Sequence, residues 1–112
     1  MKRRWHITSQ DGTVTLARQL PARFDVAARA DLPPGRPLRL AHQIRQDLWR
    51  VMRNVRGFSP VVRLAPTGTG WAVTAGGRAI GRISADTEAT IEALLNDTTK
   101  RARWVAQARM TS

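Results

Sequence analysis

The stretch between residues 37 and 56 carries apolar side chains at the spacing of one helical face. An α-helix turns about 100° per residue, so side chains three, four or seven positions apart project from the same side. The spacing predicts a helix that begins at Pro37 or Leu38, ends at Val55 or Arg56 and stops at Gly57. Its buried face is expected to comprise Ala41, Ile44, Leu48, Val51, Met52 and Val55.

Two elements are expected before this long helix. Residues 5–7 and 14–16 alternate apolar and polar side chains on either side of Asp11-Gly12, a pair typical of hairpin turns. Residues 21–29, with Pro21 near the first turn, are expected to form a short helix. Three prolines lie within residues 33–37, so this stretch cannot be helix interior and is expected to connect the two halves of one domain.

A three-stranded meander is expected after the long helix. Its strands are predicted at roughly 60–65, 71–75 and 78–83, and a turn at 67–70 joins the first two. Gly76-Gly77 is predicted to form the second turn, because both central residues of such a turn need positive φ and glycine adopts it readily. A two-residue turn there would pair Val73 with Ile80 and Trp71 with Arg82.

The last third of the chain is expected to form two helices. Ser84 or Asp86 is predicted to cap the first, whose apolar face holds Ile91, Leu94 and Leu95. Residues 96–99 interrupt the pattern, and Asp97 is predicted to cap a final helix.

The predicted elements indicate an α+β fold within a single domain of residues 1–112. An antiparallel sheet, made of the N-terminal hairpin and the meander, would pack against the long helix and the C-terminal helices. From residue 37 to residue 108 this layout resembles the double-stranded RNA-binding domain. That family has a basic tract at the start of its last helix, where this chain has Asp86 and Glu88, so no site residue is carried over from it.

The charge of the chain is strongly unbalanced. Nineteen Lys and Arg face eight Asp and Glu, which gives a net charge of +11. A folded domain with this charge repels itself, and polyanions or acidic surfaces are the partners that relieve such repulsion. Abundant Arg and Ala also fit a biased genome composition, which explains Arg in place of Lys but not the surplus of bases over acids.

Several classes of protein and site are disfavoured. With no cysteine, the chain has no disulfide framework and no thiolate metal site. No segment reaches the roughly 18 apolar residues of a membrane span, and no apolar stretch follows the basic start Lys2-Arg3-Arg4 as in a signal peptide. We therefore expect a cytoplasmic protein. His6 and His42 lie outside any catalytic or metal-binding motif, so neither an enzyme nor a cofactor is expected.

The solvent side of the long helix is the predicted binding site. Guanidinium groups about one turn apart suit a phosphate backbone, and an exposed indole can stack on an unpaired base. The predicted nucleic-acid-binding residues are Arg39, Arg45, Trp49, Arg50, Arg53 and Arg56.

Three functions remain open. The first is a non-enzymatic module that binds DNA or RNA through this arginine face. The second is a protein–protein adaptor or regulator that docks on an acidic partner. The third, a minor alternative, is an enzyme of a kind that the sequence motifs do not identify.

Overall fold

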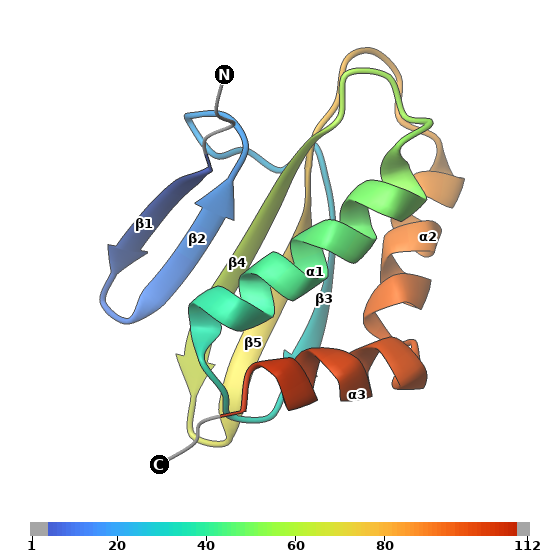
Figure 1. Cartoon of the computed structure of the whole chain (residues 1–112). Coiled ribbons are helices and arrows are strands. Elements are labelled where there is room, and N and C mark those ends of the chain that lie inside the picture. The colour runs from blue at the N-terminus through green and yellow to red at the C-terminus, as the bar shows by residue number, and fades with distance from the viewer. Residues whose placement is uncertain (1–4, 110–112) are drawn as a thin grey trace.

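The structure is a computed structural model, and it describes residues 5–109. Five strands form one antiparallel sheet in the order β1-β2-β4-β5-β3, the helices α1 and α2 pack against it, and α3 packs against these two helices (Figure 1). The predicted α+β class is therefore confirmed. The elements are β1 (His6–Gln10), β2 (Thr13–Ala17), β3 (Val26–Leu32), α1 (Pro37–Met52), β4 (Ser59–Thr67), β5 (Gly70–Arg78), α2 (Ala85–Leu95) and α3 (Thr98–Gln107).

The N-terminal hairpin forms as predicted. Gln10 faces Thr13, so the turn contains only Asp11 and Gly12. Both residues have positive φ, 54° and 83°, as a two-residue turn of the type that Asp-Gly favours requires.

The long helix also forms, but it ends about one turn earlier than predicted. Ile44, Leu48 and Met52 are fully buried, whereas Val51 is exposed. After Met52 the chain turns, and the Val55 N–H donates to the Met52 carbonyl at 2.9 Å. Gly57, with φ 65°, lies against the side chain of Ile80 so closely that a Cβ atom would collide with it.

The short helix predicted for residues 21–29 is wrong, because residues 26–32 form the edge strand β3. Val26, Ala28 and Leu32 are buried and Ala30 is half-buried, whereas Arg29 and Asp31 between them are exposed. This period of two is the pattern of a half-buried strand. Seven backbone positions pair with β5, and this pairing overrides the helical preference of an alanine-rich stretch.

The strand predicted for residues 78–83 is also wrong. β5 continues through Gly76 and Gly77 to Arg78, so the two glycines are strand interior instead of a turn. Val73 faces Leu64 and not Ile80, while the Trp71 indole donates to the Gly35 carbonyl at 3.0 Å instead of lying across from Arg82. β3 occupies the place beside β5, so the third strand precedes α1 and the double-stranded RNA-binding layout does not hold.

A long connection follows from this strand order. Because β4 and β5 lie between β2 and β3, residues 18–25 must cross the end of the sheet; we call them the crossing segment. The Arg18 N–H donates to the Pro60 carbonyl at 3.1 Å, and the Asp25 N–H donates to the Gly77 carbonyl at 2.8 Å. The crossing segment is thus bonded to the start of β4 and the end of β5.

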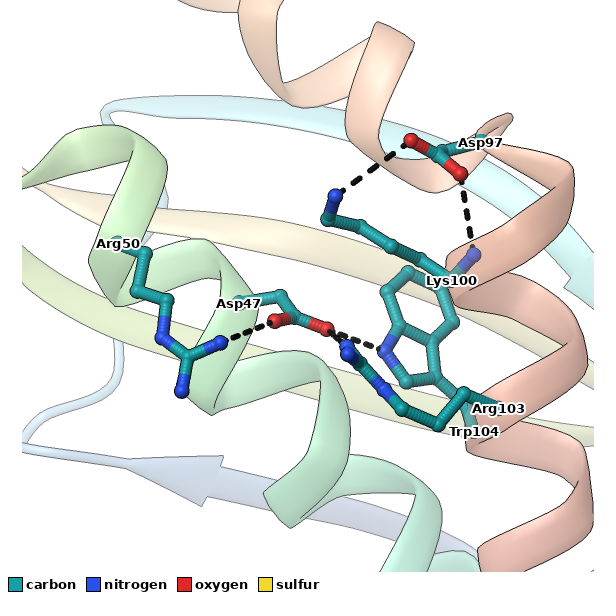
Figure 2. A network of polar contacts seen from close by, with 6 residues as sticks. All are labelled: Asp47, Arg50, Asp97, Lys100, Arg103 and Trp104. Atoms are coloured by element: carbon teal, nitrogen blue, oxygen red, sulfur yellow. Dashed lines mark hydrogen bonds and ion pairs between the residues drawn. The ribbon is translucent and has the colours of Figure 1, made fainter.

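The C-terminal helices match the prediction closely. Ile91, Leu94 and Leu95 of α2 are buried, and Asp97 caps α3 by accepting from the Lys100 backbone N–H at 3.0 Å (Figure 2). Ser84 occupies the N-cap position of α2 without a side-chain capping bond.

A buried carboxylate joins α1 to α3. Asp47 is 2% exposed, and its Oδ2 accepts from the Trp104 Nε1–H at 2.7 Å and from an Arg103 guanidinium N–H. Arg50 donates to the other oxygen at 3.4 Å (Figure 2). A buried charge is tolerated only where donors satisfy it, so this network fixes how α1 lies against α3.

Candidate functional site

A hollow of about 640 Å³ opens at the end of the sheet where β2 ends and β4 begins. Four arginines and two tryptophans line it, together with the exposed Ile80, and no Asp or Glu is among its lining residues in the described part of the chain. We call it the basic hollow. The residues that matter for its chemistry are Trp5, Arg18, Arg23, Arg45, Trp49 and Arg78.

Elements far apart in the sequence build the basic hollow. Arg18 and Arg23 come from the crossing segment, and Arg78 is the last residue of β5. Arg45 and Trp49 lie four residues apart on α1, so they project from the same side of the helix. In Figure 1 the loop after α1 and the loop after β5 lie side by side, and the Ile80 N–H donates to the Arg56 carbonyl at 3.3 Å.

Two of the guanidinium groups are held in place but keep most of their donors. Arg78 Nη2 donates to the Pro21 carbonyl at 2.5 Å, and Arg45 Nη2 bonds His42 Nδ1 at 3.1 Å. Within residues 5–109 each makes only that hydrogen bond, and the buried Nε–H of each has no acceptor. Partial burial lowers the pKa of Arg45, yet an arginine pKa lies so far above 7 that the group stays cationic.

Arg23 forms an ion pair with a carboxylate. Its Nε and Nη2 donate to the two oxygens of Asp25 at 2.9 and 3.2 Å. Asp25 Oδ2 also accepts from the Ala79 N–H at 3.0 Å. Arg23 and then the Ala79 N–H hold the pKa of Asp25 below its usual value. Through the hydrogen bond between Asp25 and Ala79, this ion pair joins the crossing segment to the end of β5.

Apolar groups lie beside these cations. The guanidinium carbon of Arg45 is 4.6 Å from the centre of the Trp5 ring, and that of Arg18 is 5.8 Å from it. These are cation–π distances, so the Trp5 ring helps to hold both cations. Trp49 is 47% exposed and Ile80 is 69% exposed. The basic hollow therefore offers exposed apolar surface next to positively charged hydrogen-bond donors.

The six residues predicted from the sequence do not form one site. Arg45 and Trp49 line the basic hollow, and Arg56 directly precedes Gly57 on its rim. Helical spacing places Arg39 and Arg50 of α1, and Arg53 at its C-cap, on a second stripe that we call the outer stripe. Arg39 and Arg53 are exposed there. Arg50 uses one of its N–H donors to bind Asp47. The basic start Lys2-Arg3-Arg4 lies outside the described residues.

Sequence reasoning missed Arg18, Arg23 and Arg78 as members of a site. Each lies in or next to a segment whose partner is distant in sequence, such as Arg78 and Pro21. The usable signal was an arginine directly after the apolar strand 13–17 and another at the end of the strand 70–78. That signal becomes meaningful only when the two strand ends are known to lie at the same end of the sheet.

His42 gives the first testable prediction, on stability against pH. Burial, and secondly the charge of Arg45, lowers the pKa of His42. The folded state then binds its proton less readily than the unfolded chain, whose His pKa is about 6.5. The neutral His42 ring therefore contributes fully to stability above about pH 6.5, and this contribution decreases as the pH falls below that value. Urea unfolding at pH 7.5 and pH 5.0 should show this loss, and His42→Gln should reduce it.

The control is wild type measured at the same two pH values, because it differs from His42→Gln only in this one imidazole. The lowered pKa values of Asp25 and Asp97 put their titration below this window. If His42→Gln loses as much stability between pH 7.5 and pH 5.0 as wild type does, His42 is not the source of the pH dependence.

Searches against protein-family models, curated proteins and solved structures find no match. Within residues 5–109, no helix is long and apolar enough to cross a membrane. The same residues contain no group of three His, Cys, Asp or Glu side chains placed to hold a metal ion.

Proposed function

We propose that this protein is a non-enzymatic module that binds nucleic acid through the basic hollow and the outer stripe of α1. The observation that carries the proposal is the gathering of four arginines and the exposed Trp49 around one hollow, in a chain with a net charge of +11. Guanidinium groups form paired hydrogen bonds with phosphate oxygens, and an indole adds a surface for stacking.

The binding mechanism is electrostatic capture. Arg39 and Arg53 on the outer stripe are exposed, and within the described chain neither joins an ion pair. Contacts of this kind position a phosphate backbone and carry no sequence information. Binding should therefore weaken steeply with salt, with a log–log slope of about −0.9 per neutralised phosphate on duplex DNA. A cytoplasmic location remains part of this proposal.

Charge reversal on the outer stripe provides the second prediction. Arg53→Glu should weaken binding to a fluorescein-labelled DNA about tenfold at 100 mM salt and reduce the salt slope by about 1. Fluorescence anisotropy across a salt series measures both quantities. Arg50 is a poorer choice, because a glutamate there would face the buried Asp47 and disturb the fold.

Arg29→Glu is the matched control. It makes the same change in net charge, from +11 to +9, but Arg29 lies on β3, in register with Thr74 and alternating with the core-facing Ala28. Equal losses in the two variants would mean that total charge, and not α1, governs binding. Absence of nucleic-acid binding, with a stoichiometric complex with an acidic protein instead, would replace this proposal by the adaptor function.

A further inference from the structure

We infer that the basic hollow is a subsite for one unpaired nucleotide of a single strand, with its base against Trp49 and its phosphates on the arginines. This inference rests on the proposed function and makes it more specific, because it predicts a preference for single strands over duplex.

The first argument is the exposure of Trp49. Of the four tryptophans, Trp104 is fully buried and Trp5 and Trp71 are half-buried, whereas Trp49 is 47% exposed. Two of the six large apolar side chains exposed in the described residues, Trp49 and Ile80, line this one hollow. Exposed apolar surface costs free energy unless a ligand covers it. A flat apolar group, such as a nucleobase, can cover this exposed surface.

The second argument is the chemistry beside Trp49. Arg45 and Arg78 line the same hollow, and each keeps most of its donors unused. No acid lines the hollow within the described chain. A ligand must therefore combine an anionic part with a flat apolar part. A nucleotide combines both parts in one unit, whereas in an acidic peptide the carboxylates and any aromatic ring belong to different residues.

The third argument concerns size and pairing. At about 640 Å³ the hollow is in the range of pockets that enclose one small-molecule ligand. A base inside a duplex is already stacked on both faces, so it reaches an indole only after it leaves the stack. A single strand presents its bases at no such cost. The subsite therefore selects single strands, whereas the outer stripe binds the backbone of either form.

The test compares fluorescein-labelled dT12 with a blunt 12-base-pair duplex, bound to variants of the full chain at 100 mM salt. Trp49→Ala should weaken binding to dT12 about tenfold and change duplex binding less than twofold. Trp49→Phe keeps a ring for stacking, so it should restore most of the dT12 affinity. Val51→Ala is the control, because Val51 is exposed on α1 and does not line the hollow.

Intrinsic tryptophan fluorescence, measured with unlabelled dT12, reports on the contact itself. Wild type should be quenched by dT12, and Trp49→Phe should lose most of that quenching while it still binds. Thermal melts of Trp49→Ala should match those of Val51→Ala, which separates a binding defect from a folding defect.

The subsite and the proposed function fail in different ways. Equal effects of Trp49→Ala on dT12 and duplex, or no effect on either, would overturn the subsite. In that case salt-dependent binding that Arg53→Glu weakens would leave the proposed function standing. Failure of wild type to bind either nucleic acid would overturn both, and binding of poly-glutamate in its place would identify an acidic protein as the partner.

Discussion

Replacing Gly76 with alanine is expected to lower the free energy of unfolding by about 3 kcal/mol or more. A Cβ atom at Gly76 would overlap the carbonyl oxygen of Val26 on the neighbouring strand. That oxygen belongs to backbone and cannot move aside as a flexible side chain can. β3 and β5 would have to separate, and their pairing fixes the edge of the sheet. Urea unfolding followed by tryptophan fluorescence measures the effect.

Two further variants make this prediction specific. Gly68→Ala, in the turn between β4 and β5, should change stability by less than about 0.5 kcal/mol, because a Cβ there meets no atom within 4 Å. Gly76→Asn distinguishes strand from turn. Asparagine tolerates positive φ, so it would be accepted in a tight turn, but not at this point of β5. A stable Gly76→Asn variant would contradict the strand assignment.

Replacing Asp47 with alanine is expected to cost about 2–3 kcal/mol, or about 10 °C in melting temperature for a chain of this size. The change leaves the buried Trp104 Nε1–H without its acceptor. Arg103 also loses its partner, but it is 47% exposed and can turn to water, so most of the cost comes from the indole. Thermal melts monitored by circular dichroism give the shift.

A double-mutant cycle assigns this loss to the indole bond. Trp104→Phe removes the donor and keeps a ring in the core, although the smaller ring leaves a cavity. If the bond matters, Asp47→Ala combined with Trp104→Phe should cost about 1 kcal/mol less than the sum of the single changes. Arg50→Ala is the control and should cost no more than about 0.5 kcal/mol, because Arg50 is 68% exposed. Additive single effects would mean that Asp47 stabilises the fold in some other way.

Part of the candidate site was predictable from the sequence. Arg45 and Trp49 lie four residues apart on one helix, and the helix was readable from its apolar spacing. Their neighbours were not predictable in the same way. Arg18 and Arg78 meet α1 only because the crossing segment and the end of β5 lie at the same end of the sheet.

Asp47 shows the same limit in another form. It is the only acid of α1, and helical spacing alone places it at the margin of the apolar face. Its burial depends on α3, because Trp104 and Arg103 supply the donors that make a buried carboxylate tolerable. Those donors lie 56 and 57 residues away in the sequence.

The sequence alone determined the elements that local forces specify. The Asp11-Gly12 turn, most of α1, the apolar face of α2 and the Asp97 cap all depend on residues within a few positions of one another. The identity of β3 and the continuation of β5 through Gly76 were decided only by the tertiary structure. The alanine-rich residues 26–32 favour a helix locally. Pairing with β5, whose Gly76 allows the two backbones to approach closely, stabilises them more as the strand β3. The basic hollow exists for the same reason, since its arginines gather only after this strand order forms.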